Sequence, residues 1–304
     1  MKMIVSGATG FVGRAVVAEL VENGDQITLL IRCGSGDNEG SSKITIDDFL
    51  ANPTLADEYD AFIHLAGLAH GKSLGQGTLE EEMYAVNTQL TADLAEAVFR
   101  HSAARFVFLS SMAVYGKDSS AQAITEESEL AAQTPYGQSK LEAEKAVSAL
   151  ASVYAGNYVV VRPPLVYGAN APANFGLLNR LAQTPIPLPF AHATAKRSNI
   201  GVRNLAAFLR VVAEHPAARN QTFVIADDEP DSLLALITAL RNGEGRSLPV
   251  PISFLEAGLR IIGKRKMAQQ LFAPLSIDWT KARRELGWQP IYSFDQNMSP
   301  VKDL

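Results

Sequence analysis

The 304-residue chain contains only one cysteine, Cys33. A single thiol excludes a disulfide within the chain and favours a reducing compartment. The chain also lacks an apolar stretch of the roughly 18 residues that a membrane span needs. An apolar, β-rich run begins almost at Met1, where a signal peptide would carry a charged segment. We therefore expect a cytoplasmic protein with no membrane insertion.

Basic clusters and metal-ligand patterns are scarce as well. The formal net charge is -5 and the isoelectric point is near 5.6, and we find no basic block of the kind that concentrates positive charge for nucleic acid. The five histidines show no metal-ligand spacing. We expect neither a nucleic-acid partner nor a metal, so a phosphate group would have to be held by local backbone geometry.

The hydrophobic pattern indicates an α/β fold. With 47% hydrophobic and 19% charged residues, the chain has enough apolar side chains for a large core. Continuous apolar strands separated by amphipathic helices are typical of a parallel sheet covered on both faces. The strand runs read MKMIVSG, QITLLIR, AFIHLAG, RFVFLSS and YVVVRPP, and the helical segments GRAVVAELVENG, LEEEMYAVNTQLTADLAEAVFRHS and SKLEAEKAVSALASVYAG. The prediction is a doubly wound parallel sheet, the Rossmann arrangement.

The alternation of strands and helices weakens after Tyr167, where the stretches QTPIPLPF and RNGEGR introduce turns. We assign residues 1–166 to a dinucleotide-binding domain, and residues 167–195 and 227–304 to a smaller substrate-binding region. The run AARNQTFVIAD predicts a strand that returns to the main sheet, so a segment of about 196–226 is placed with the first domain.

Three glycines follow the first strand run and open the first helix. Gly7, Gly10 and Gly13 carry no side chains, so backbone N–H groups at the positive end of the helix can approach a pyrophosphate. Their spacing, G-x-x-G-x-x-G, differs from the dinucleotide fingerprint G-x-G-x-x-G. A tight turn without a ligand is the alternative, and the position at the first strand-to-helix junction favours a dinucleotide.

The second strand run bears on which dinucleotide binds. Sites for NAD commonly place a carboxylate at the end of this strand to bind the ribose 2′-hydroxyl, but here Ile31 takes that place and Arg32 follows. Arg14 could add a second cation, and a guanidinium pairs well with a 2′-phosphate. We predict NADP as the cofactor, with NAD as a possibility. The alternative interpretation of Arg32 is a solvated residue at the end of the strand. Asp47 and Asp48 follow a third strand and either touch the adenine or cap a helix.

The stretch TPYGQSKLEAEK carries the strongest catalytic signal. Tyr136 and Lys140 are four residues apart at a helix start, so they share one helix face. A nearby ammonium favours the phenolate, and we expect it to lower the pKa of Tyr136 from its ordinary value of about 10. Ser110 and Ser111 end the preceding strand run and offer hydroxyls to a carbonyl oxygen or alkoxide. Ser111, Tyr136 and Lys140 are the predicted catalytic residues.

The chain resembles the extended short-chain dehydrogenase/reductases, and among them the nucleotide-sugar epimerases and reductases. The resemblance spans nearly the whole chain and rests on SGATGFVG, HLAG, LSSMAVYG, TPYGQSK and RPPLVYG in this order, followed by KRSNIGVRNLAAFL and LSIDWTKARRELGWQP. It implies that hydride moves between a nicotinamide and C4 of the sugar of a nucleotide-diphosphate sugar, while Tyr136 moves the proton and Ser111 stabilises the oxygen.

The resemblance also implies which residues bind each ligand. Asn174 and Arg197 would hold the substrate diphosphate, and Ser111 and Tyr136 would contact the sugar. The alternatives are loop hydrogen bonding for Asn174 and a surface salt bridge for Arg197. Besides Arg32, Asp47 and Asp48, the residues implied for the cofactor are Gly7, Thr9, Gly10, Phe11, Val12, Gly13, Leu65, Ala66, Gly67, Asn87, Ser110, Tyr136, Lys140 and Pro163.

One departure from the family narrows the reaction. Dehydratases of this family carry an Asp-Glu pair where this chain has Met112 and Ala113, which cannot transfer protons. This leaves 4-epimerisation and reduction of a 4-keto sugar. A non-nucleotide carbonyl substrate, or an NADP-binding sensor or scaffold without turnover, is the alternative.

The family often dimerises through helices that correspond to residues 80–101 and 137–154, so a homodimer is possible. Small apolar side chains that suit helix packing are Ala92, Ala95, Ala146 and Leu150.

Overall fold

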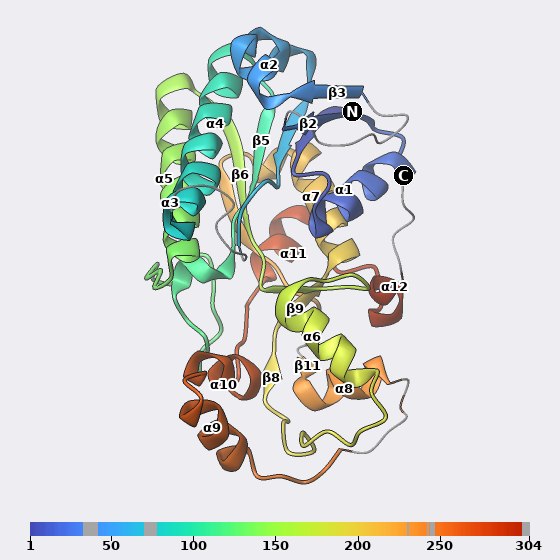
Figure 1. The fold of residues 1–304 in the computed structure, drawn as a ribbon. Coiled ribbons are helices and arrows are strands. Elements are labelled where there is room, and N and C mark those ends of the chain that lie inside the picture. The colour runs from blue at the N-terminus through green and yellow to red at the C-terminus, as the bar shows by residue number, and fades with distance from the viewer. Residues whose placement is uncertain (33–41, 70–77, 230, 242, 244–246, 300–304) are drawn as a thin grey trace.

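A seven-stranded parallel sheet forms the larger part of the molecule (Figure 1). The computed structural model describes residues 1–32, 42–69, 78–229, 231–241, 243 and 247–299. The strand order is β10-β6-β5-β4-β1-β2-β3, and each neighbouring pair is parallel. The strands are β1 (Lys2–Ser6), β2 (Gln26–Ile31), β3 (Ser42–Thr45), β4 (Ala61–His64), β5 (Arg105–Leu109), β6 (Asn157–Arg162) and β10 (Gln221–Val224).

Helices cover both faces of this sheet because its central strands are apolar on both sides. In β1, Met3 and Val5 face one buried cluster and Ile4 faces the other, as the alternation of side chains along a strand requires. The first face carries α1 (Phe11–Glu22) and α7 (Val202–Glu214), and the second carries α2 (Ile46–Ala51), α4 (Leu90–His101) and α5 (Pro135–Tyr154). The predicted doubly wound α/β fold is confirmed.

The chain leaves the sheet after β6 and later returns to it. The returning strand β10 pairs with β6, which confirms the strand predicted from AARNQTFVIAD. Arg105 of β5 connects the sheet to the returning segment, because its guanidinium donates to the carbonyl oxygens of Val212 (2.8 Å) and His215 (2.7 Å). Between β6 and α7 lie β7 (Leu165–Tyr167), α6 (Ala173–Ala182), β8 (Lys196–Arg197) and β9 (Asn199–Gly201).

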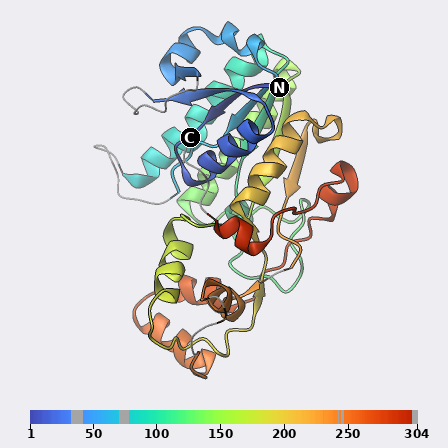
Figure 2. The same ribbon diagram turned by 90° about the vertical axis from the view of Figure 1, so that its right-hand side faces the viewer.

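A smaller lobe lies beyond the carboxyl ends of the strands (Figures 1 and 2). It has its own apolar cluster, to which Leu188, Leu233, Ile237, Ala268 and Phe272 contribute. Its elements are α6, β8, β11 (Asp231–Ser232), α8 (Leu233–Leu240), α9 (Ile252–Ile261) and α10 (Arg265–Phe272). No helix in the described part of the chain is long and apolar enough to cross a membrane.

The last segment packs back onto the sheet domain. Ala282, Leu286 and Trp288 join the cluster beneath α1 and α7, and the Trp288 ring meets Phe208 edge to face at 4.8 Å between centroids. The helices of this segment are α11 (Thr280–Leu286) and α12 (Phe294–Met298). The remaining helical elements are α3 (Leu79–Met83), the π-helical turn Tyr84–Gln89, and short 3₁₀ turns at Pro53–Glu58, Met112–Tyr115 and Pro216–Ala218.

Candidate active site

The glycine turn between β1 and α1 is shaped by close backbone contacts. Gly7 has φ of +74°, a conformation that L side chains rarely adopt, and a Cβ there would lie 2.6 Å from the Ala66 nitrogen. A Cβ on Gly13 would lie 2.7 Å from the Ala8 Cα, so only glycine lets the helix approach the turn this closely. Gly10 is the N-cap of α1, whose first turn contains no acidic residue. The turn therefore fits a pyrophosphate at the positive end of α1.

The residues after β4 lie directly beside this turn. Leu65 donates its backbone N–H to the Ser6 carbonyl at 3.1 Å. Asn87 is fully buried on the π-helical turn, and its side-chain amide forms two hydrogen bonds with the backbone of Leu68. The amide oxygen accepts from the Leu68 N–H at 2.7 Å, and the amide nitrogen donates to the Leu68 carbonyl at 2.9 Å. The same amide donates to the Ser139 hydroxyl of α5 at 2.9 Å. Asn87 thus links the segment after β4 to the helix that carries Tyr136.

The end of β2 carries the cationic residues that the sequence singles out. Arg32 is exposed directly after the strand, and Arg14 donates its Nε to the Thr9 carbonyl at 3.2 Å. Asp47 and Asp48 lie in the first turn of α2, and Asp48 forms reciprocal hydrogen bonds with Thr45, the N-cap residue. Asp48 therefore supports the cap that Thr45 provides for α2, and contact of Asp47 or Asp48 with the adenine stays a prediction.

Ser111, Tyr136 and Lys140 meet where β5 ends and α5 begins. Thr134 caps α5 by accepting from the Gly137 N–H at 3.1 Å, which places Tyr136 in the first turn. The Ser111 side chain lies close enough to the Tyr136 phenol to lower the phenol's pKa. The buried Lys140 ammonium donates to the Leu109 carbonyl at 3.0 Å and lies 4.7 Å from the centroid of the Phe108 ring. The structure brings the three predicted residues together.

The pKa values of Lys140 and Tyr136 are shifted mainly by burial. Burial lowers the pKa of Lys140 to about 8, and the negative charge of Glu144 opposes this shift. Burial raises the pKa of Tyr136, while the hydrogen bond from Ser111 works in the opposite direction. The expected lowering of the Tyr136 pKa is therefore wrong for this structure, because desolvation of the phenolate dominates.

A buried ion pair behind the site was not predicted. Arg162 of β6 binds Glu144 of α5 through two hydrogen bonds of 3.0 and 2.6 Å, and donates to the Tyr115 hydroxyl at 2.7 Å. Ser110, implied as a cofactor contact, donates its hydroxyl to Glu144. Pro163 follows Arg162 and accepts at its carbonyl from the Met112 N–H at 3.0 Å. The signal in the sequence was an arginine in a buried strand and a glutamate one helical turn after Lys140.

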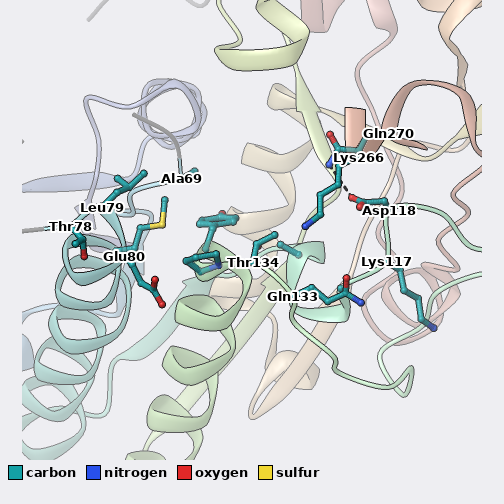
Figure 3. Close-up of a pocket in the computed structure, with 15 residues that line it drawn as sticks. Ala69, Thr78, Leu79, Glu80, Lys117, Asp118, Gln133, Thr134, Lys266 and Gln270 are labelled. Carbon is teal, nitrogen blue, oxygen red and sulfur yellow. Dashed lines mark hydrogen bonds between the residues drawn. The ribbon is translucent and has the colours of Figure 1, made fainter. Parts of the chain in front are cut away.

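A cavity of about 610 Å³ opens beside Tyr136 (Figure 3). Ala113 and Thr134 line it from the sheet domain, and Lys266 and Gln270 line it from α10 of the smaller lobe. Figure 3 shows the Lys266 side chain directed into the cavity, and Gln270 donates to Asp118 across its rim at 2.9 Å. Of the three predicted catalytic residues, Tyr136 lines this cavity, and it shares the cavity with a cation of the second lobe that sequence patterns did not indicate.

The two residues expected at the substrate diphosphate have different outcomes. Arg197 of β8 directs its guanidinium at backbone carbonyls: it donates to Ala273, to Gln269 at 3.3 Å and to Asp118 at 3.0 Å. Arg197 therefore joins α10 to the segment after β5 through backbone carbonyls rather than through a surface salt bridge, and its contact with a substrate diphosphate stays a prediction. Asn174 is in the first turn of α6, and its side chain lies outside what the structure describes.

In the part of the chain that the structure describes, no group of three or more His, Cys, Asp or Glu side chains could hold a metal ion.

Comparison with known proteins shows the family. The model of the NAD dependent epimerase/dehydratase family matches residues 3–226. A UDP-glucose 4-epimerase of Vibrio cholerae is 31% identical over 299 residues, which cover 95% of this chain and 90% of that protein. A UDP-glucose 4-epimerase of Corynebacterium glutamicum is 23% identical, with 95% and 91% of the two chains covered.

Solved structures agree on the fold. A putative epimerase from Burkholderia cenocepacia superimposes with a TM-score of 0.75 at 23% identity, with 97% of this chain and 95% of that chain covered. The UDP-glucuronic acid 4-epimerase of Bacillus cereus, solved in complex with NAD, superimposes with a TM-score of 0.74 at 19% identity, with 98% and 96% covered. The chain belongs to the NAD dependent epimerase/dehydratase family, and the resemblance to extended short-chain dehydrogenase/reductases is confirmed.

Proposed function

We propose that the protein is a nucleotide-sugar 4-epimerase that uses a nicotinamide dinucleotide and acts on a UDP-sugar. The observation that carries the proposal is the cavity of about 610 Å³ with Tyr136 in its wall, because Ser111 lies beside the phenol and Lys140 lies one helical turn further along α5. The UDP-glucose 4-epimerase of Vibrio cholerae, aligned over 95% of this chain, supports the choice of substrate class.

The chain's own residues fit a dinucleotide. Gly7 and Gly13 let the β1–α1 turn pack directly against backbone, where Cβ atoms would collide, and the turn leads into the N-terminus of α1, which favours an anion. Gly67 faces the Lys140 ammonium, and a Cβ at that position would lie 3.1 Å from Nζ. Lys140 therefore lies next to Gly67, one of the residues that the family resemblance implies for the cofactor. These residues would hold the dinucleotide, which would supply the hydride acceptor and donor for C4 of the sugar.

Proton transfer is the task of Tyr136. In the first half-reaction the C4 hydroxyl gives its proton to the phenolate of Tyr136 as the hydride leaves C4, and a 4-keto sugar forms. In the second half-reaction the phenol returns the proton as the hydride is delivered to the opposite face. Ser111 donates a hydrogen bond to the sugar oxygen, and the Lys140 ammonium stabilises the phenolate. Met112 and Ala113 supply no proton-transferring group, which argues against dehydration.

Reduction of a 4-keto sugar with NADPH is the second candidate, and one observation favours it. Arg32 is exposed directly after β2, and the strand has no carboxylate to bind a ribose 2′-hydroxyl. A guanidinium here would pair with a 2′-phosphate. A reductase consumes NADPH from solution, whereas an epimerase recycles the same dinucleotide.

A panel of UDP- and dTDP-sugars, followed by NMR with and without added NADPH, tests both candidates. The epimerase converts UDP-glucose to its 4-epimer with no net consumption of dinucleotide, and the reductase oxidises NADPH in step with a 4-keto sugar. Tyr136→Phe should lower turnover roughly 10²- to 10⁴-fold without preventing dinucleotide binding. Tyr158→Phe is the matched control, because Tyr158 contacts Ser148 rather than the site. A Tyr136→Phe enzyme as fast as wild type would refute the mechanism.

A further inference from the structure

The helix α9 presents apolar side chains to solvent along one face. Phe254, Ile261 and Ile262 are 70%, 85% and 63% exposed. With the exposed Ala257 and Gly258 they form a row at positions i, i+3, i+4, i+7 and i+8 along and just past α9, which is one side of a helix.

The opposite side of α9 already has a partner within the fold. Ile252, Leu255 and Leu259 pack against the apolar cluster of the smaller lobe. The helix is therefore apolar on two sides, and only one of them is used by the described part of the chain. Large apolar side chains gathered on one exposed face mark an interaction surface.

Four cations accompany this row within seven residues. Arg260, Lys264, Arg265 and Lys266 are all exposed, although the chain as a whole carries a formal net charge of -5. Lys264, Arg265 and Lys266 are consecutive in the sequence, and the turn at Gly263, with φ of +73°, places them at the junction of α9 and α10. Lys264, Arg265 and Lys266 stand at the N-terminus of α10, where the helix dipole disfavours positive charge. An external anionic surface would offset that cost.

We propose that this surface, the α9 patch (Phe254, Arg260, Ile261, Ile262, Lys264 and Arg265), binds the anionic surface of a phospholipid membrane. Apolar side chains on a helix lying in the interface enter the boundary between headgroups and acyl chains, and nearby cations attract anionic lipids. The patch lies at the end of the molecule opposite α2, so nothing in the sheet domain obstructs a flat surface there (Figure 1).

A second copy of the chain fits this patch less well. A symmetric contact through α9 would bring the cations of both copies together, and like charges at an interface oppose association. The patch also adjoins the proposed active site, because Lys266 follows Arg265 and is directed into the cavity beside Tyr136 (Figure 3). Membrane attachment through α9 would therefore hold the cavity close to the lipid surface.

Vesicle sedimentation of the full chain tests the proposal. The probes are vesicles of phosphatidylcholine alone and vesicles in which about a third of the lipid is phosphatidylglycerol. The wild-type protein should bind the anionic vesicles, lose binding at high salt, and bind the neutral vesicles at least about tenfold less. The double variant Ile261→Asp/Ile262→Asp should bind anionic vesicles at least about tenfold less than wild type.

Two further variants keep the result interpretable. Ile291→Asp changes an isoleucine that is 61% exposed outside the α9 patch, and it should bind like wild type. Arg260→Gln/Lys264→Gln/Arg265→Gln should lose the preference for anionic lipid while circular dichroism and UDP-sugar turnover stay unchanged. The proposal fails if wild type does not bind anionic vesicles, if Ile291→Asp is impaired as strongly as the double variant, or if light scattering shows an oligomer that the double variant dissociates.

Discussion

Replacing Glu144 with glutamine should destabilise the fold and also move the alkaline limit of activity to lower pH. Glu144 and Arg162 are 7% and 6% exposed, and glutamine removes the charge that compensates the buried guanidinium. Loss of one partner of a buried pair costs about 3–5 kcal/mol. Glutamine keeps the shape and one acceptor oxygen, so we expect about 3 kcal/mol, or roughly 6 °C in the unfolding midpoint of a chain of this size.

The effect on activity acts through Lys140. Burial holds its pKa at about 8, and Glu144 is the charge that raises it. Glu144→Gln removes that contribution, so the Lys140 pKa falls further and the ammonium deprotonates at lower pH. If the ammonium supports Tyr136, wild-type activity should decline as pH rises through about 8, and the variant should decline earlier.

The assay is the pH profile of kcat/KM for UDP-sugar epimerisation, measured beside denaturant unfolding. Glu142→Gln is the matched control, since Glu142 is exposed and lies two residues away on the same helix. A Glu144→Gln enzyme that is destabilised but keeps the wild-type alkaline limit would show that the ion pair is structural only. An unchanged stability would contradict the reasoning about burial itself.

Three other substitutions test the ligand contacts. Arg32→Ala should weaken NADPH binding by roughly 1–3 kcal/mol and leave NADH nearly unchanged; equal wild-type affinities for the two dinucleotides, by calorimetry, would remove Arg32 from recognition. Arg197→Ala should weaken binding of free UDP by about 1.5–3 kcal/mol if the guanidinium also reaches the diphosphate. A lower unfolding midpoint with unchanged UDP affinity would show that Arg197 only joins α10 to the Asp118 segment. Gly13→Ala should abolish dinucleotide binding, measured by fluorescence titration, because the new Cβ would lie 2.7 Å from the Ala8 Cα; normal affinity would show that the turn relaxes.

Local patterns were sufficient to predict the sheet and the helix that carries the proposed catalytic pair. The apolar runs of β1, β4, β5 and β6 and the i, i+4 spacing of Tyr136 and Lys140 are properties of short stretches. The direction of the Tyr136 pKa shift was wrong because it depends on how much protein surrounds the phenol, and spacing along a helix carries no information about burial.

Contacts between distant segments explain the other differences. The Glu144–Arg162 pair joins α5 to β6, and Lys266 reaches the cavity from α10, 130 residues after Tyr136. The contact of Arg197 with a diphosphate, expected from the family resemblance, stays a prediction, whereas its hydrogen bonds to the carbonyls of Asp118, Gln269 and Ala273 could not be predicted from the sequence. A sequence pattern indicates a charged side chain, and only the folded chain decides which acceptors it meets.

The late return of β10 to the sheet has a consequence for synthesis on the ribosome. β6 ends at Arg162 and β10 begins at Gln221, so the 58 residues 163–220 must be made before the strand beside β6 exists. At about 5–20 residues per second, translation of that stretch takes roughly 3 to 12 s. During this interval the valines of β6 form an open, apolar sheet edge, which is the kind of surface that aggregates or recruits chaperones. The nascent chain is therefore most vulnerable while the smaller lobe's first half is being translated, and slow codons within 163–220 would prolong that exposure.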